Sequence, residues 1–132
     1  MMKKIKMATK CVLILAFGMT ALTGCAAAEA EFGFMSGREA YELVVNGTDA
    51  IILDVRSTEE FSSGHIEGAI SLPLHEIENE AENVLLDQDV LILVVCQSGN
   101  RSQVASQQLA DLGFTNVYDI GGVVSWPGEL MQ

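Results

Sequence analysis

Residues 90–95 read VLILVV and residues 50–53 read AIIL, and these two short runs decide the fold. Both are apolar, mostly β-branched and free of polar alternation. Each is therefore predicted to be a strand covered on both faces, which is typical of a parallel sheet. A third strand is expected over residues 116–120, after the last helical segment.

Helix signals lie between and around these strands. The segments Ser36–Glu39 and Ser57–Glu60 match the capping box, which satisfies the free amides at a helix start. Apolar side chains recur at helical spacing over residues 77–85 and 104–112, and Gly113 then ends the second of these helices. The alternation of strands and helices predicts an α/β domain of three layers, with a mostly parallel central sheet and helices on both faces.

The first 24 residues have the features of a secretory signal. Four lysines precede a short apolar stretch that is too short to span a bilayer comfortably. The stretch ends at residues 22–25, Leu-Thr-Gly-Cys, which resemble the lipobox of bacterial lipoproteins, although an uncut membrane anchor is an alternative. We expect a signal peptide over residues 1–24, a tether over 25–33 with Cys25 as the lipidated residue, and one domain over 34–132.

Charge is distributed unevenly along the chain. All 18 acidic residues lie beyond the signal, whereas only three cations do, Arg38, Arg56 and Arg101, so the exported part carries a net charge of −15. Such a field disfavours nucleic acid and anionic lipid surfaces as partners. We expect a monomer that contacts the membrane through its lipid alone, on the outer face of the cell membrane or on the outer membrane.

Cys96 is the one thiol left in the exported part, because Cys11 leaves with the signal and Cys25 is expected to carry lipid. A lone cysteine is either a buried apolar filler or a reactive group. Cys96 ends a predicted buried strand and opens a polar loop, residues 97–102, at the sheet edge where ligands bind. The inward amides of this loop, with Gly99 permitting the turn, would stabilise a thiolate at the start of the next helix.

Three ordered motifs resemble those of the rhodanese family. The active loop of that family runs from a persulfide-forming cysteine to an arginine with four residues between them, which here are Cys96 and Arg101. The other matching segments are residues 53–56 (LDVR), 59–61 (EEF), 64–70 (GHIEGAI), 114–118 (FTNVY), 121–122 (GG) and Trp126. Together they cover roughly residues 34 to 128, in order and with family-like separations.

The resemblance implies a rhodanese-like fold and a thiosulfate sulfurtransferase activity. Cys96 would take sulfur from thiosulfate or a persulfide, hold it as a persulfide and pass it to a thiol or protein acceptor, without a metal or an organic cofactor. The implied substrate-binding residues are Gln97, Ser98, Gly99, Asn100, Arg101 and Ser102. Arg101 would neutralise the oxyanion of the donor, and Ser102 could donate a hydrogen bond toward the sulfur.

Asp54, Arg56 and His65 are expected to support the site without acting in catalysis. The Asp54 carboxylate can bind loop amides, Arg56 can pair with Asp54 or with Glu60, and His65 can fix its own turn by hydrogen bonding. Sulfur transfer needs no general base once the thiolate is formed.

Two other functions use related architecture. Phosphatases and arsenate reductases also surround an oxyanion with a cysteine and an arginine, but they generally carry five residues between the two, whereas this loop has four. A rhodanese-fold module that only binds partners or senses redox state is the second alternative, and retention of Cys96 leaves redox sensing open.

Overall fold

The computed structural model describes residues 29–132, so the predicted signal peptide and Cys25 lie outside the described residues. Within this part, five strands form a wholly parallel sheet in the order β1-β6-β5-β2-β4. The strands are β1 (Gly33–Phe34), β2 (Ala50–Asp54), β4 (Ile70–Ser71), β5 (Leu91–Cys96) and β6 (Val117–Gly122). The expectation of a parallel α/β fold is confirmed.

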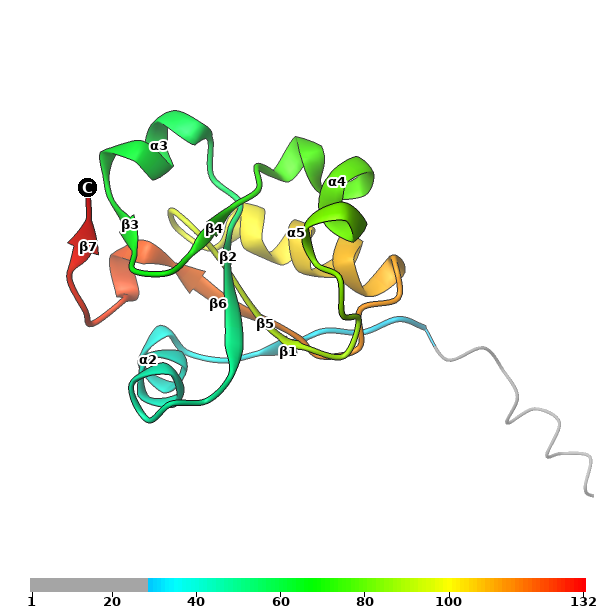
Figure 1. Cartoon of the computed structure of the whole chain (residues 1–132), viewed down its shortest axis with the longest axis horizontal. Coiled ribbons are helices and arrows are strands. Elements are labelled where there is room, and N and C mark those ends of the chain that lie inside the picture. Colours follow the sequence, from blue (N-terminus) through cyan, green and yellow to red (C-terminus); the bar gives the residue numbers. More distant parts are fainter. Residues whose placement is uncertain (1–28) are drawn as a thin grey trace, which may run out of the picture.

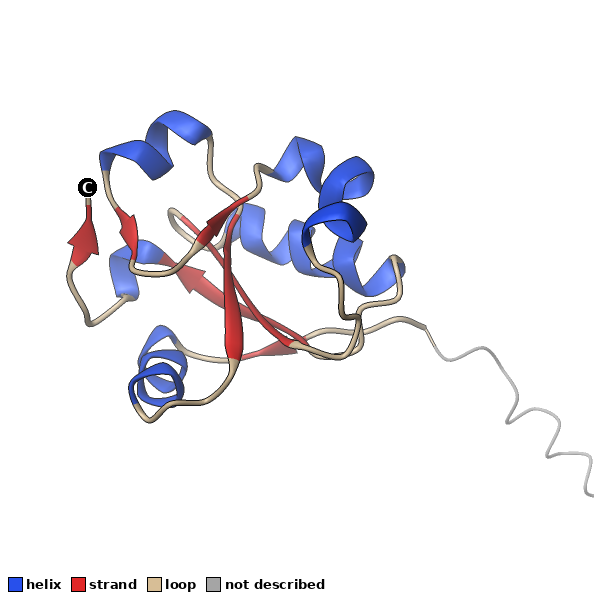
Figure 2. Cartoon of the chain, in the orientation of Figure 1, coloured by secondary structure: helices blue, strands red, loops and turns tan. Residues whose placement is uncertain are grey.

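Helices cover both faces of the sheet (Figure 1, Figure 2). One face is packed by α2 (Gly37–Val45) and the short helix η3 (Val123–Ser125), and the other by α4 (Ile77–Val84) and α5 (Asn100–Asp111). The helix α3 (Thr58–Ser63) follows β2, and the 3-10 turn η2 (Leu74–Glu76) leads into α4.

Alternate residues of β5 enter two separate hydrophobic clusters. Ile92, Val94 and Cys96 point into the cluster shared with α4 and α5, whereas Leu93 and Val95 point into the cluster shared with α2. The strand is thus buried on both faces, which explains why its sequence lacks polar alternation. The side chain of Cys96 therefore lies on the α5 side of the sheet.

Both predicted capping boxes form. Ser36 and Glu39 exchange backbone-to-side-chain hydrogen bonds of 3.0 and 3.1 Å at the start of α2, and the second box does the same at the start of α3. The helices expected over residues 77–85 and 104–112 are present as α4 and α5. Local sequence signals therefore located the four main helices.

The very short strands were not predicted. Besides β1 and β4, the chain has β3 (His65–Ile66) and β7 (Leu130–Met131), which pair with each other antiparallel. Gly33, which we had placed at the end of the tether, pairs with Tyr118 in the main sheet. Two residues are too few to show a strand periodicity, so such elements become visible only through their pairing partners.

Within residues 29–132, no helix combines the length and the apolar character needed to cross a membrane.

Candidate active site

Cys96 ends the central strand with its sulfur bound by the following loop. The residue is only 1% exposed, and its Sγ accepts a hydrogen bond from the Gly99 N–H at 3.0 Å. Gly99 adopts φ +107°, in the left-handed region that favours glycine, and α5 begins at the next residue. The loop therefore turns a main-chain donor and the amino end of a helix toward the thiol.

The pKa of Cys96 reflects two opposing effects. Burial raises the pKa of the thiol, but hydrogen bonding with the Ser102 side chain and with the backbone N–H groups of Ser102, Gly99 and Ser98 outweighs it. The net pKa lies below the ordinary value of a thiol. More of the nucleophilic thiolate is therefore present at neutral pH than in a free cysteine.

Ser102 lies directly beside the sulfur and is itself held by a buried carboxylate. Its Oγ is 3.5 Å from Cys96 Sγ and donates a hydrogen bond to Asp119 Oδ1 at 2.6 Å. The same carboxylate oxygen accepts from the Gly121 N–H at 2.9 Å. Asp119 and the sulfur thus share a single hydroxyl group, and Asp119 fixes its position.

Asp119 was missed by the sequence analysis. It lies inside the strand expected over residues 116–120, and an acidic side chain in an otherwise apolar strand was the available signal. Its role depends on β6 lying next to β5, an arrangement that the sequence alone does not give.

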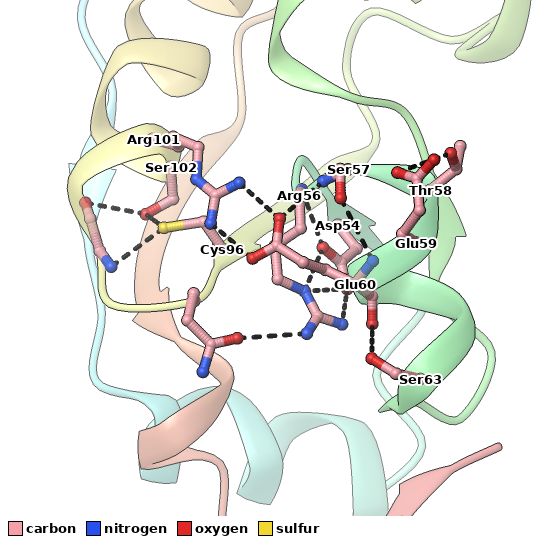
Figure 3. A network of polar contacts seen from close by, with 12 residues as sticks. Asp54, Arg56, Ser57, Thr58, Glu59, Glu60, Ser63, Cys96, Arg101 and Ser102 are labelled. Carbon is pink, nitrogen blue, oxygen red and sulfur yellow. Dashed lines mark hydrogen bonds and ion pairs between the residues drawn. The ribbon is translucent and has the colours of Figure 1, made fainter.

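Arg101 forms a two-point ion pair with Glu60 (Figure 3). The two guanidinium nitrogens donate to the two carboxylate oxygens at 2.7 and 2.9 Å. This pairing, together with the Ser57 N–H, lowers the pKa of Glu60 to about 2 and raises that of Arg101, so both groups stay charged across the neutral range. Arg101 was expected to bind the oxyanion of the donor, and its pairing with Glu60 was not predicted.

Asp54 and Arg56 form a second, buried ion pair between the active loop and α3 (Figure 3). The Arg56 side chain donates to the Asp54 carboxylate at 2.7 to 3.1 Å, to the Gly64 carbonyl at 2.7 Å and to the Gln97 side chain at 3.3 Å. The pair thus ties the end of β2 to the end of α3 and to the active loop.

His65 is engaged in its own turn. Its Nδ1 lies 2.9 Å from the Phe61 carbonyl oxygen, and its ring stacks on that of Phe61 with centroids 3.9 Å apart. These contacts hold the His65 ring against the end of α3.

The remaining loop residues lie on the outside of the turn. Ser98 and Asn100 are exposed, as is Gln97. The backbone of Gln97 packs against Gly122, where an added Cβ would collide with the Gln97 carbonyl and come within 2.8 Å of Ser98 Cα. Close backbone contact at Gly122 therefore sets the position of the loop.

Among residues 29–132, no group of three or more His, Cys, Asp or Glu side chains is placed to hold a metal ion. The geometry instead defines a class of parallel α/β proteins that present a cysteine, bound by main-chain amides, at the carboxyl end of a central strand.

Within this class, the chain belongs to the rhodanese family, because the profile of the Rhodanese-like domain matches residues 36–129. It is 39% identical over 107 residues to the thiosulfate sulfurtransferase GlpE of Pseudomonas entomophila, which covers 77% of this chain and 94% of that protein. It is 32% identical over 71 residues to the thiosulfate sulfurtransferase PspE of Escherichia coli, over 54% of this chain and 68% of that protein.

A solved structure supports the same assignment. The rhodanese-related protein of Thermoplasma volcanium has a TM-score of 0.66 and 28% identity, with 76% of this chain and 98% of that chain covered. The protein is thus a rhodanese-type enzyme similar to thiosulfate sulfurtransferases.

Proposed function

We propose that this enzyme moves sulfane sulfur from a donor to a thiophilic acceptor through a persulfide on Cys96. The observation that carries the proposal is the hydrogen bond from the Gly99 N–H to Cys96 Sγ, together with the lowered pKa of that thiol. A thiolate held by fixed main-chain donors is a prepared nucleophile, and the same donors suit the anionic persulfide that follows.

With thiosulfate as donor, the Cys96 thiolate bonds to the outer sulfur. The S–S bond of the donor breaks, its electron pair leaves with sulfite, and the cysteine keeps one extra sulfur as a persulfide anion. Cyanide, or a thiol or protein acceptor, then attacks that outer sulfur and releases the thiolate. The main-chain donors of residues 97–102 act in both steps, and the route uses no metal or organic cofactor.

Intact-protein mass spectrometry tests this route. After treatment with thiosulfate or an organic persulfide, the wild-type protein is expected to gain the mass of one sulfur, and cyanide is expected to remove it. Cys96→Ser should gain none and should lose at least about 1000-fold in sulfur transfer, because the nucleophile is gone. Sulfur gain by Cys96→Ser, or no gain by the wild type with either donor, would refute the proposal.

An assay of phosphatase activity on the same purified protein distinguishes sulfur transfer from the phosphatase alternative. Release of p-nitrophenol from its phosphate ester should stay far below the rate of sulfur transfer, because a loop of four residues offers a narrow cradle for a tetrahedral phosphate. Turnover equal to or above sulfur transfer would favour the phosphatase.

We further propose that the chain is an exported lipoprotein anchored through Cys25. The lipobox-like residues 22–25 support this. In a bacterial host, Cys25→Ser is expected to abolish labelling by radioactive palmitate and to release the protein from the membrane fraction, whereas Cys11→Ser should keep both. Unchanged labelling of Cys25→Ser would contradict the anchor.

A further inference from the structure

Every cation in the part of the chain that the structure describes already has an anionic partner. Residues 29–132 contain no lysine and three arginines. Arg38 pairs with Glu42 on the exposed surface, Arg56 pairs with Asp54 in the interior, and Arg101 pairs with Glu60 beside the active loop. The site of Cys96 therefore offers a donor no uncompensated positive charge.

The Arg101–Glu60 pair is built into the fold and is not a chance surface contact. Glu60 Oε2 also accepts the Ser57 N–H at 3.0 Å, as the third residue of the capping box of α3, so the start of that helix holds the carboxylate in place. The carboxylate stays ionised at neutral pH, since its pKa is about 2. An oxyanion that binds Arg101 therefore meets a guanidinium whose charge is already compensated by Glu60.

Figure 3 shows the Arg101 guanidinium between the Glu60 carboxylate and the Cys96 sulfur. The raised pKa of Arg101 comes mainly from its bond to Glu60, with a smaller contribution from the charge of Cys96. A donor approaching Cys96 thus meets an ion pair where a free arginine was expected. A dianion is repelled more strongly by Glu60 than a monoanion is.

Beside Arg101 lies a shallow depression of about 440 Å³. Its lining is Val55, Ser57, Pro73, Leu74, His75, Arg101, Val104 and Gln108. This lining contains no carboxylate, and Arg101 is the residue that it shares with the active site. Its apolar side chains could contact the carbon skeleton of a donor bound at Arg101.

We propose that Glu60 is a specificity-determining residue that neutralises Arg101 and makes the Cys96 site prefer singly charged organic persulfides over dianionic thiosulfate. This inference rests on the sulfur transfer proposed for Cys96. The Cys96 thiolate bonds to the terminal sulfur of the persulfide and the S–S bond of the donor breaks. The electron pair of that bond goes to the organic sulfur, which leaves as a thiolate, and Cys96 keeps the transferred sulfur. Glu60 acts through Arg101 and does not touch the reacting atoms.

The test compares Glu60→Gln with Glu59→Gln. Glutamine also serves in a capping box, so Glu60→Gln keeps the helix start while removing the charge. Glu59 is the matched control, since it is exposed on the same helix and its carboxylate accepts a hydrogen bond from the Thr58 hydroxyl at 3.4 Å, not from an arginine. Stopped-flow loading of Cys96 gives kcat/KM for thiosulfate and for 2-hydroxyethyl persulfide, and circular dichroism checks the fold of each variant.

Wild type is expected to prefer the persulfide. Glu60→Gln should raise kcat/KM for thiosulfate at least about tenfold and that for the persulfide no more than about threefold, because repulsion scales with the charge of the donor. Glu59→Gln should change both by less than about twofold, since an exposed charge is screened by solvent and salt. An unchanged donor ratio in Glu60→Gln would overturn the inference.

Val104→Ser tests the apolar depression without changing any charge. Val104 is half exposed, so its truncation should leave the fold intact. The KM for benzyl persulfide is expected to rise at least about threefold while loading by thiosulfate stays constant. Equal effects on both donors would contradict an organic-group site. If no donor loads Cys96 in the wild type, the proposed sulfur transfer is wrong. If both donors load Cys96 but Glu60→Gln leaves the ratio of their kcat/KM values unchanged, only the specificity inference is wrong.

Discussion

Replacing Gly122 by alanine is expected to reduce sulfur loading on Cys96 by at least about 100-fold, because misplacing a reactive group by about 1 Å costs that much. An alanine Cβ at this position would overlap the Gln97 carbonyl and lie 2.6 Å from its carbon. Gly122 has an ordinary φ of −105°, so the effect arises from lack of space and not from backbone strain. The loop must move, and the amide of Gly99 moves with it.

Two glycines provide controls for this prediction. Gly47 and Gly68 have φ of +88° and +81°, but an added Cβ meets nothing within 4 Å at either. Their alanine variants should lose about 1 kcal/mol of stability to backbone strain while keeping most of the loading rate. Mass spectrometry and stopped-flow loading give the comparison, and a Gly122→Ala protein that is folded and loads like the wild type would disprove the steric account.

Asp54→Asn should reduce the free energy of unfolding by about 3–5 kcal/mol, because it removes one partner of a buried ion pair. The Asp54 side chain is fully buried and that of Arg56 is 4% exposed, so the arginine left behind cannot reach water. Its hydrogen bonds to Gly64 and Gln97 remain but do not supply the missing charge. Urea unfolding followed by circular dichroism measures the change.

The control is the exposed Arg38–Glu42 pair, whose side chains are 81% and 58% accessible. Glu42→Gln should alter the free energy of unfolding by less than about 1 kcal/mol, as is usual for a surface ion pair. Similar losses in Asp54→Asn and Glu42→Gln would show that burial of the pair does not matter.

Much of the fold could be predicted because its signals are local. Unbroken apolar runs predict the buried strands, and capping boxes of four consecutive residues predict the starts of α2 and α3. The two-residue strands β3, β4 and β7 have no such signal, since they exist only through pairing with distant segments. Family resemblance supplied the order of the motifs but not these pairings.

The features of the active site that could be predicted are also those that are local in sequence. The loop after Cys96 was predictable because its glycine, arginine and serine follow the cysteine directly in sequence. The Glu60–Arg101 pair joins residues 41 positions apart, and the Ser102–Asp119 hydrogen bond joins residues 17 positions apart. Both depend on which strands are neighbours. The sequence left Asp54 and Glu60 as possible partners of Arg56. In the structure Arg56 pairs with Asp54, and Glu60 pairs with Arg101.

The burial of Cys96 affects the two steps of sulfur transfer differently. In the proposed persulfide, the outer sulfur would lie about 2 Å from Cys96 Sγ, whose residue is only 1% exposed. An acceptor attacks this outer sulfur and does not need to contact Cys96 Sγ. A donor must contact Cys96 Sγ itself, so the burial of this atom restricts loading to donors whose terminal sulfur can enter the loop.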